Sequence, residues 1–260
     1  MSTTTMDQSA GATGTPAPLG APTGIPFARL LRVEWGKATD TRAARWLLAL
    51  VALSTTGFML IPLLAHGVEQ SFSSYLGSAG AVQILLPVVA ILTLTSEWSQ
   101  RTVLTTFTQE PRRLRVVLAK VAVSVLLGVA GALFGLLVTA AALAVSALAG
   151  RHVELDVSAG LILGFGVFVL LNVLSGVAIG ALLTNSATAV VAYFALPISF
   201  RLLGAVVTFV QEWIDSTTTF NWFLLGEPGG HWPQIVVSTT LWVIAPLAAG
   251  LVRTVRRDIT

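Results

Sequence analysis

The chain has 260 residues, of which 55% are hydrophobic and only 10% charged, and its mean hydropathy is +0.83. A soluble domain carries about 25% charged residues because its surface faces water, so the composition excludes an ordinary soluble protein and predicts an all-α integral membrane protein. The net charge of +3 is too small to indicate a nucleic-acid partner. The absence of cysteine excludes disulfides and thiolate metal sites.

The chain begins with a polar tail, and a short amphipathic segment follows it. Residues 1–26 are rich in Ser, Thr, Ala, Gly and Pro, which predicts a disordered tail, retained because it lacks the pattern of a signal peptide. Residues 27–45 predict an amphipathic interfacial helix, called here the pre-span helix. Glu34 falls in its apolar stripe, where it either pairs with Lys37 three residues on or makes a docking contact to another subunit.

Six later stretches are long enough to cross about 30 Å of hydrocarbon. The third is too long for a simple span, so we expect it to tilt or to extend into the cytoplasm. Only Thr184, Asn185 and Ser186 separate the fourth from the fifth, which predicts a tight antiparallel hairpin. The predicted spans are 46–65, 79–95, 118–149, 158–183, 187–210 and 235–252.

The basic residues fix the expected orientation. They gather before the first span, between the second and third, and in a basic tail, 253–260, whereas the other side carries six of the 12 acidic residues and all three histidines. Because cytoplasmic loops are enriched in Lys and Arg, six spans with both termini in the cytoplasm are predicted. Only Lys37 and Lys120 are lysines among 15 basic residues, a bias typical of a GC-rich bacterial genome.

The segment 97–119 between the second and third spans predicts two short helices at an angle. Pro111 ends the first, and the apolar spacing of the second continues into the third span. Its arginines fit two interpretations by chemistry alone: contact with anionic lipid headgroups, or a site for a protein partner.

The run Glu97-Trp-Ser-Gln-Arg-Thr-Val-Leu-Thr-Thr-Phe-Thr-Gln-Glu-Pro-Arg-Arg-Leu-Arg-Val-Val-Leu-Ala-Lys120 resembles the loop after the second span in ABC-2 type transporter permeases. Leu31-Arg-Val-Glu-Trp-Gly-Lys37 also resembles the amphipathic helix that precedes the first span in that family. The resemblance implies two paired membrane domains, each docked through a cytoplasmic coupling helix on a cytoplasmic ATP-binding subunit. When the family's pattern is transferred to this sequence, the resemblance implies that the coupling positions are Glu97, Arg101, Thr105, Pro111, Arg112 and Arg113. The corresponding positions of the pre-span helix are Arg32, Glu34 and Lys37. It also implies short helices in the outer leaflet between spans five and six, for which residues 211–234 are the candidate.

No catalytic site is expected in this chain. The sequence contains neither the P-loop pattern G-x-x-x-x-G-K-[ST] nor H-E-x-x-H, so ATP and Mg²⁺ are expected on the partner subunit, with no cofactor or metal here. Arg201 is the one charge that lies well away from the ends of a predicted span. It either snorkels outward or lines a translocation path and pairs with a polar group such as Asn172.

The leading hypothesis is therefore the permease subunit of an ATP-driven exporter in a bacterial plasma membrane. A hydrophobic drug, a lipid-like molecule or a peptide fits the apolar spans equally well. Expected partners are the ATP-binding subunit, a second permease copy or homologue, and membrane lipids. The alternative is a non-transporting membrane scaffold or immunity-type protein. A secondary transporter is disfavoured, because the spans lack the acidic residues that ion coupling usually needs.

Overall fold

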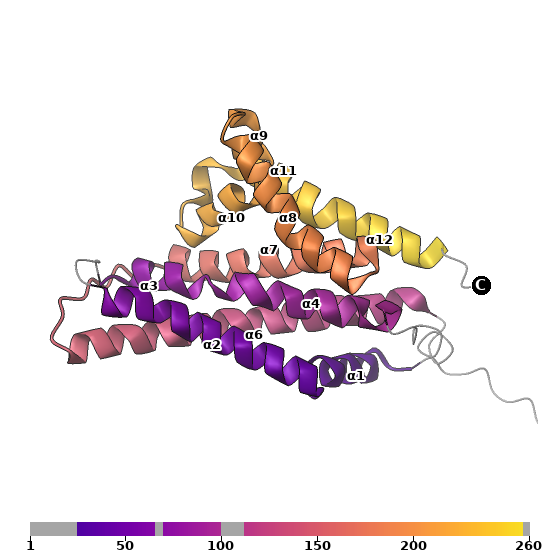
Figure 1. The fold of residues 1–260 in the computed structure, drawn as a ribbon, viewed down its shortest axis with the longest axis horizontal. Helices are drawn as coiled ribbons and strands as arrows, with labels where there is room; N and C mark the ends of the chain where they lie inside the picture. Colours follow the sequence, from indigo (N-terminus) through magenta and orange to yellow (C-terminus); the bar gives the residue numbers. More distant parts are fainter. Residues whose placement is uncertain (1–24, 66–69, 100–111, 257–260) are drawn as a thin grey trace, which may run out of the picture.

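A computed structural model describes residues 25–65, 70–99 and 112–256, and these fold as helices joined by short connections (Figure 1). Within these ranges six helical segments are long and apolar enough to cross a membrane, which confirms the all-α, six-span prediction in its coarse form. The elements are α1 (Phe27–Thr39), α2 (Arg42–Leu64), α3 (Phe72–Ala79), α4 (Val82–Ser99), α6 (Arg113–Leu148), α7 (Ala159–Leu183), α8 (Ser186–Gly204), α9 (Thr208–Trp213), α10 (Ser216–Leu224), the 3₁₀ turn η1 (Pro228–Gly230), α11 (Trp232–Thr239), the π-helical turn η2 (Thr240–Ile244) and α12 (Ala245–Arg256).

Several helix ends differ from the predicted ones, and two of the differences have a clear local cause. The pre-span helix α1 ends at Thr39 rather than at residue 45, because Thr41 caps the next helix by accepting a hydrogen bond from the Ala44 amide at 3.1 Å. Span five ends at Gly204 rather than at residue 210. The chain reverses there into α9, and a Cβ at Gly204 would lie 3.1 Å from the backbone of Gln211, so the missing side chain permits the close turn.

The span-capable segments are Arg42–Leu64, Phe72–Trp98, Leu114–Leu148, Ala159–Leu183, Ser186–Gly204 and Trp232–Thr254. The third is contained in α6, a helix of 36 residues, about 54 Å long at 1.5 Å per residue. Such a helix exceeds the hydrocarbon thickness of about 30 Å. It therefore has to tilt or to extend beyond the lipid.

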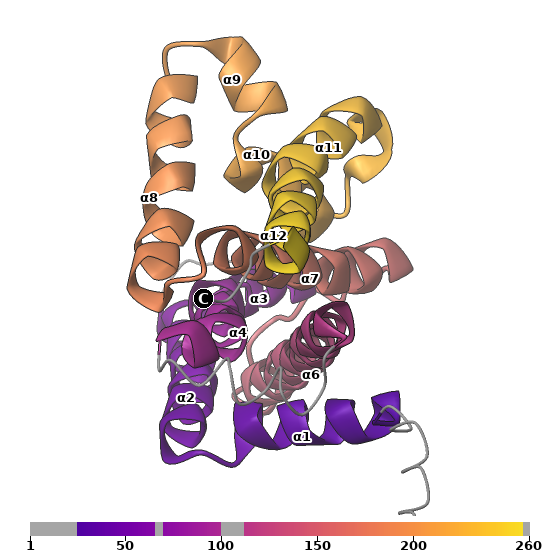
Figure 2. The ribbon, with the colours of Figure 1, turned by 90° about the vertical axis from the view of Figure 1, so that its right-hand side faces the viewer.

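Helix α7 is the centre of the bundle, with α4, α6, α10 and α12 packed around it (Figure 2). Close approach is possible because α7 carries glycine where its neighbours contact it. At Gly176 a Cβ would lie only 3.0 Å from Pro87 of α4, and at Gly164 it would overlap the carbonyl oxygen of Phe223 in α10. Helices α2 and α8 contribute fewer buried residues to this core, so their outward faces are apolar and exposed.

The two described ends of the chain lie at the same end of the bundle. Helix α1, the end of α4, the start of α6 and the end of α12 gather there, whereas α3, α10 and the 149–158 connection lie at the other (Figure 1). Arg115 of α6 donates a hydrogen bond of 2.8 Å to the carbonyl of Ile25. Arg253 of α12 donates one of 2.6 Å to the carbonyl of Leu182. The segment 100–111 is attached at this end.

Candidate functional site

Four charged side chains from three helices meet at the end of the bundle that carries α1. They are Glu34 and Lys37 of α1, Glu97 of α4 and Lys120 of α6, called here the charge cluster. The Lys120 ammonium lies 2.6 Å from one carboxylate oxygen of Glu34 and 3.3 Å from the Glu97 carboxylate. The Lys37 ammonium lies 2.7 Å from the other oxygen of Glu34 and 2.6 Å from Glu97. Two positive and two negative charges make the cluster neutral.

The helical period brings these residues together. On α1 the buried positions are Leu30, Glu34 and Ala38, spaced by four residues, so Glu34 occupies the face that packs on α6. In Figure 2, α1 lies across the end of the bundle, below α6. Residues three and four positions from Lys120 on α6 lie on the same face of the helix, and two of them, Val116 and Val123, are fully buried. Lys120 therefore also points inward.

The cluster is mostly removed from solvent. The side chains of Glu34, Lys120 and Glu97 are 3%, 5% and 11% exposed, whereas that of Lys37 is 43% exposed. Charges that are buried to this degree are stable only if they are paired. Burial by itself lowers the pKa of Lys37, but the hydrogen bonds from its ammonium to Glu34 and Glu97 outweigh burial and leave the pKa above its ordinary value of 10.5.

This geometry decides between the two interpretations of Glu34. The expected pair with Lys37 is present, and the second carboxylate oxygen accepts a hydrogen bond from Lys120. Because Glu34 is only 2% exposed and both its oxygens are used within the chain, a docking contact through this carboxylate does not fit. Arg32 of the same helix is exposed and faces away from the cluster.

The other coupling positions lie within the segment 100–111 or directly after it. Arg101, Thr105 and Pro111 lie outside the described residues. Arg112 is exposed and immediately precedes α6, and Arg113 is the first residue of that helix. Glu97 and Lys120 thus tie the last turn of α4 to the second turn of α6, on the two sides of the predicted coupling segment.

The sequence matches no protein-family model and no curated protein. The charge cluster and its position are therefore the basis for a functional interpretation.

The two predicted translocation residues are not brought together. Asn172 donates a hydrogen bond of 2.8 Å to the Phe168 carbonyl, within its own helix, and lines a cavity between α4, α7, α8, α10 and η2. Arg201 is exposed and is not among the residues that line this cavity. Among the residues that the structure describes, no hydrogen bond joins Arg201 to Asn172, so the expected pair is not formed.

Lys120 is a functional candidate that the sequence reasoning missed, since it used this residue only for the orientation of the spans and as part of a resemblance. The sequence feature that could have identified it is its place on the apolar face that leads into a span, because an ionisable residue in such a position is normally paired. Its principal partner, Glu34, lies 86 positions away in the sequence, so the pairing could not be assigned before the helices were placed.

Within the described ranges no group of three or more His, Cys, Asp or Glu side chains is arranged to hold a metal ion.

Proposed function

We propose that this chain is the membrane subunit of an ATP-driven exporter in a bacterial plasma membrane, with both termini in the cytoplasm. It would pair with a second permease copy or homologue. A separate cytoplasmic subunit would hydrolyse ATP with Mg²⁺. The observation that supports this proposal best is the charge cluster, because it links α1, α4 and α6 around the segment that resembles a coupling helix.

The mechanical argument follows from the placement of the cluster. A force applied by a partner to residues 100–112 reaches the membrane helices through the end of α4 and the start of α6. Lys120 contacts both carboxylates of the cluster, one on α4 and one on α1. Breaking these pairs inside an apolar bundle is costly, so the three helix ends are expected to move as one body rather than slide past each other.

The arginines at this end support the proposed orientation. Arg42, Arg45 and Arg112 are exposed near α1 and the start of α6, and cytoplasmic surfaces of membrane proteins are enriched in such residues. The same surface would meet the acidic or polar face of a nucleotide-binding partner.

The decisive experiment is to purify the tagged chain from its native membrane in mild detergent and to identify the proteins that accompany it. The expected result is a stoichiometric ATP-binding subunit. Its ATPase activity should respond to the membrane chain and be uncoupled by Arg112→Glu with Arg113→Glu. The matched control is Arg42→Glu with Arg45→Glu, which reverses the same number of charges at the same end of the bundle but outside the coupling segment.

A chain that is purified alone, or with an unrelated protein, under conditions that preserve other membrane complexes would refute the exporter and favour a scaffold. Equal loss of ATPase activity in both double variants would show a general charge effect on assembly rather than coupling through residues 112 and 113. Insertion of each variant is verified by its elution profile in detergent.

A further inference from the structure

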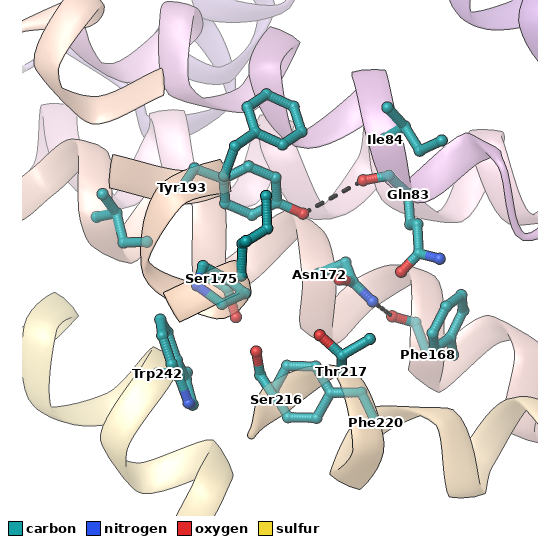
Figure 3. A pocket seen from close by; sticks show the side chains of 14 residues that line it. Gln83, Ile84, Phe168, Asn172, Ser175, Tyr193, Ser216, Thr217, Phe220 and Trp242 are labelled. Carbon is teal, nitrogen blue, oxygen red and sulfur yellow. Dashed lines mark hydrogen bonds between the residues drawn. The ribbon is translucent and has the colours of Figure 1, made fainter. Parts of the chain in front are cut away.

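A cavity of about 210 Å³ lies where Gln83 and Ile84 at the start of α4 face α7 and α8 (Figure 3). Its walls come from five elements that are distant in the sequence: α4, α7, α8, α10 and η2. The walls are mainly apolar and aromatic, with Phe168, Phe220 and Trp242 among them. An apolar cavity of about 150 Å³ can hold a benzene ring, so this one admits a group of one to two rings.

Several polar groups interrupt this apolar lining. Ser175 is the informative one, because its hydroxyl is buried, lines the cavity and has no hydrogen-bond partner among the described residues. In other spans the hydroxyls of Thr95 and Ser124 donate to the carbonyl four residues earlier, at 2.8 and 3.0 Å. Thr139 of α6 is, like Ser175, buried without a partner among the described residues, but it does not line this cavity. A buried hydroxyl without a partner costs free energy, which a ligand with a hydrogen-bonding group would recover.

The helices around the cavity are irregular. Helix α8 contains Pro197, which lines the cavity, and the last span contains the π-helical turn η2 with Trp242. A π-turn inside a helix is rare and is found frequently at functional sites. Here it places the indole so that its N–H donates a 2.7 Å hydrogen bond to the Ile214 carbonyl, which leaves the ring face to form one wall (Figure 3).

No charged side chain is found among the described residues that line the cavity. Transfer of an unpaired charge into such a site would cost several kcal/mol, so the lining selects against ions. Gln83, Asn172, Ser216 and Thr217 add amide and hydroxyl groups at the margin. The chemistry therefore fits an uncharged molecule that is mostly apolar and carries one hydrogen-bonding group.

We propose that this cavity is a binding site for a neutral, ring-sized apolar group bearing a hydroxyl or carbonyl, which is held by a hydrogen bond to Ser175. The proposal concerns binding by this chain alone and does not rest on the exporter proposal. If the chain is an exporter, the cavity defines the kind of molecule, or part of a molecule, that it accepts.

The test measures binding of tritiated 2-naphthol at pH 7 to the purified full chain in lipid nanodiscs by scintillation proximity. Saturable binding is expected. Ser175→Phe, which fills the cavity, should weaken it at least tenfold, whereas Ser199→Phe, on the exposed face of α8, should leave it unchanged. Tritiated 2-naphthoate, the anion of similar size, should bind at least tenfold more weakly than 2-naphthol.

A second comparison isolates the hydrogen bond and does not depend on the bulky variant. Ser175→Ala should weaken 2-naphthol about three- to tenfold, the effect of one ordinary hydrogen bond, and should not weaken naphthalene, which lacks the hydroxyl. The proposal is overturned if 2-naphthol shows no saturable binding, if Ser175→Phe and Ser199→Phe bind it alike, if 2-naphthoate binds equally well, or if Ser175→Ala affects both neutral probes equally.

Discussion

Replacing Lys120 by Met tests the charge cluster most directly. Methionine keeps an unbranched apolar stem of similar length and removes only the ammonium. Glu34 then loses its contact at 2.6 Å, and Glu97 keeps only Lys37. The cluster acquires a net charge of −1 in a site where the Glu34 side chain is 3% exposed. Removing one partner of a buried ion pair costs about 3–5 kcal/mol, because the remaining charge is left uncompensated.

The second lysine provides the comparison within the same cluster. Lys37→Met also leaves a net charge of −1, but the Lys37 side chain is 43% exposed, so water can hydrate the carboxylates from that side. Solvent-exposed pairs contribute at most about 1 kcal/mol. The variant is therefore expected to cost about 1 kcal/mol, clearly less than Lys120→Met.

The double variant separates loss of pairing from loss of packing. Adding Glu34→Gln to Lys120→Met restores neutrality and leaves the Lys37–Glu97 pair, so at least about 2 kcal/mol of the loss should be recovered. Unfolding midpoints in mixed detergent micelles measure the free-energy differences. Amide hydrogen exchange shows which helices are destabilised, with faster exchange expected in α1 and unchanged exchange in α7.

A cost below about 1 kcal/mol for Lys120→Met would refute this reasoning. So would equal costs for the two lysine variants, or a double variant no more stable than Lys120→Met alone. Each of these results would mean that the carboxylates are hydrated or protonated. The cluster would then not hold α1 against α4 and α6.

Two further predictions concern other parts of the fold. Gly164→Ala should destabilise the chain by about 1–3 kcal/mol, since its Cβ would overlap the Phe223 carbonyl. The control is Gly166→Ala, which has open space around it and should be neutral or stabilising by up to about 1 kcal/mol. Equal unfolding midpoints for the two variants would contradict the contact between Gly164 and Phe223. Burial raises the pKa of Asp156, but hydrogen bonds from Ser73 outweigh it and leave the pKa below its ordinary value of 3.8. Its stabilising effect is therefore present above pH 3.8 and is lost as the pH falls through the lowered pKa, so Asp156→Asn should flatten the acid branch of the stability profile, and an unchanged acid branch would show that other groups cause it.

The sequence alone was enough to predict six helices that are long and apolar enough to cross a membrane. Lipid requires long apolar helices, so length and hydropathy identify six spans without knowledge of their packing. The short break at Thr184, Asn185 and Ser186 predicted the short turn between α7 and α8, although α8 then runs at a steep angle to α7 rather than alongside it (Figures 1 and 2). Thr184 there adopts a left-handed conformation with φ of 53°, and Asn185 caps α8. Such signals are local, since each involves residues within one helical turn.

Only the tertiary structure decided which polar residues meet. The Glu34–Lys37 pair was predictable because three residues on a helix lie on one face. Its extension to Lys120 was not, because the chain in between contains two membrane spans whose packing sets the distance. The cavity likewise takes its lining from five elements. Arg201, for which a pair with Asn172 was one of two interpretations, is exposed. The length of an apolar segment is determined by consecutive residues, whereas the pairing of charges and the shape of a cavity depend on how separate helices pack.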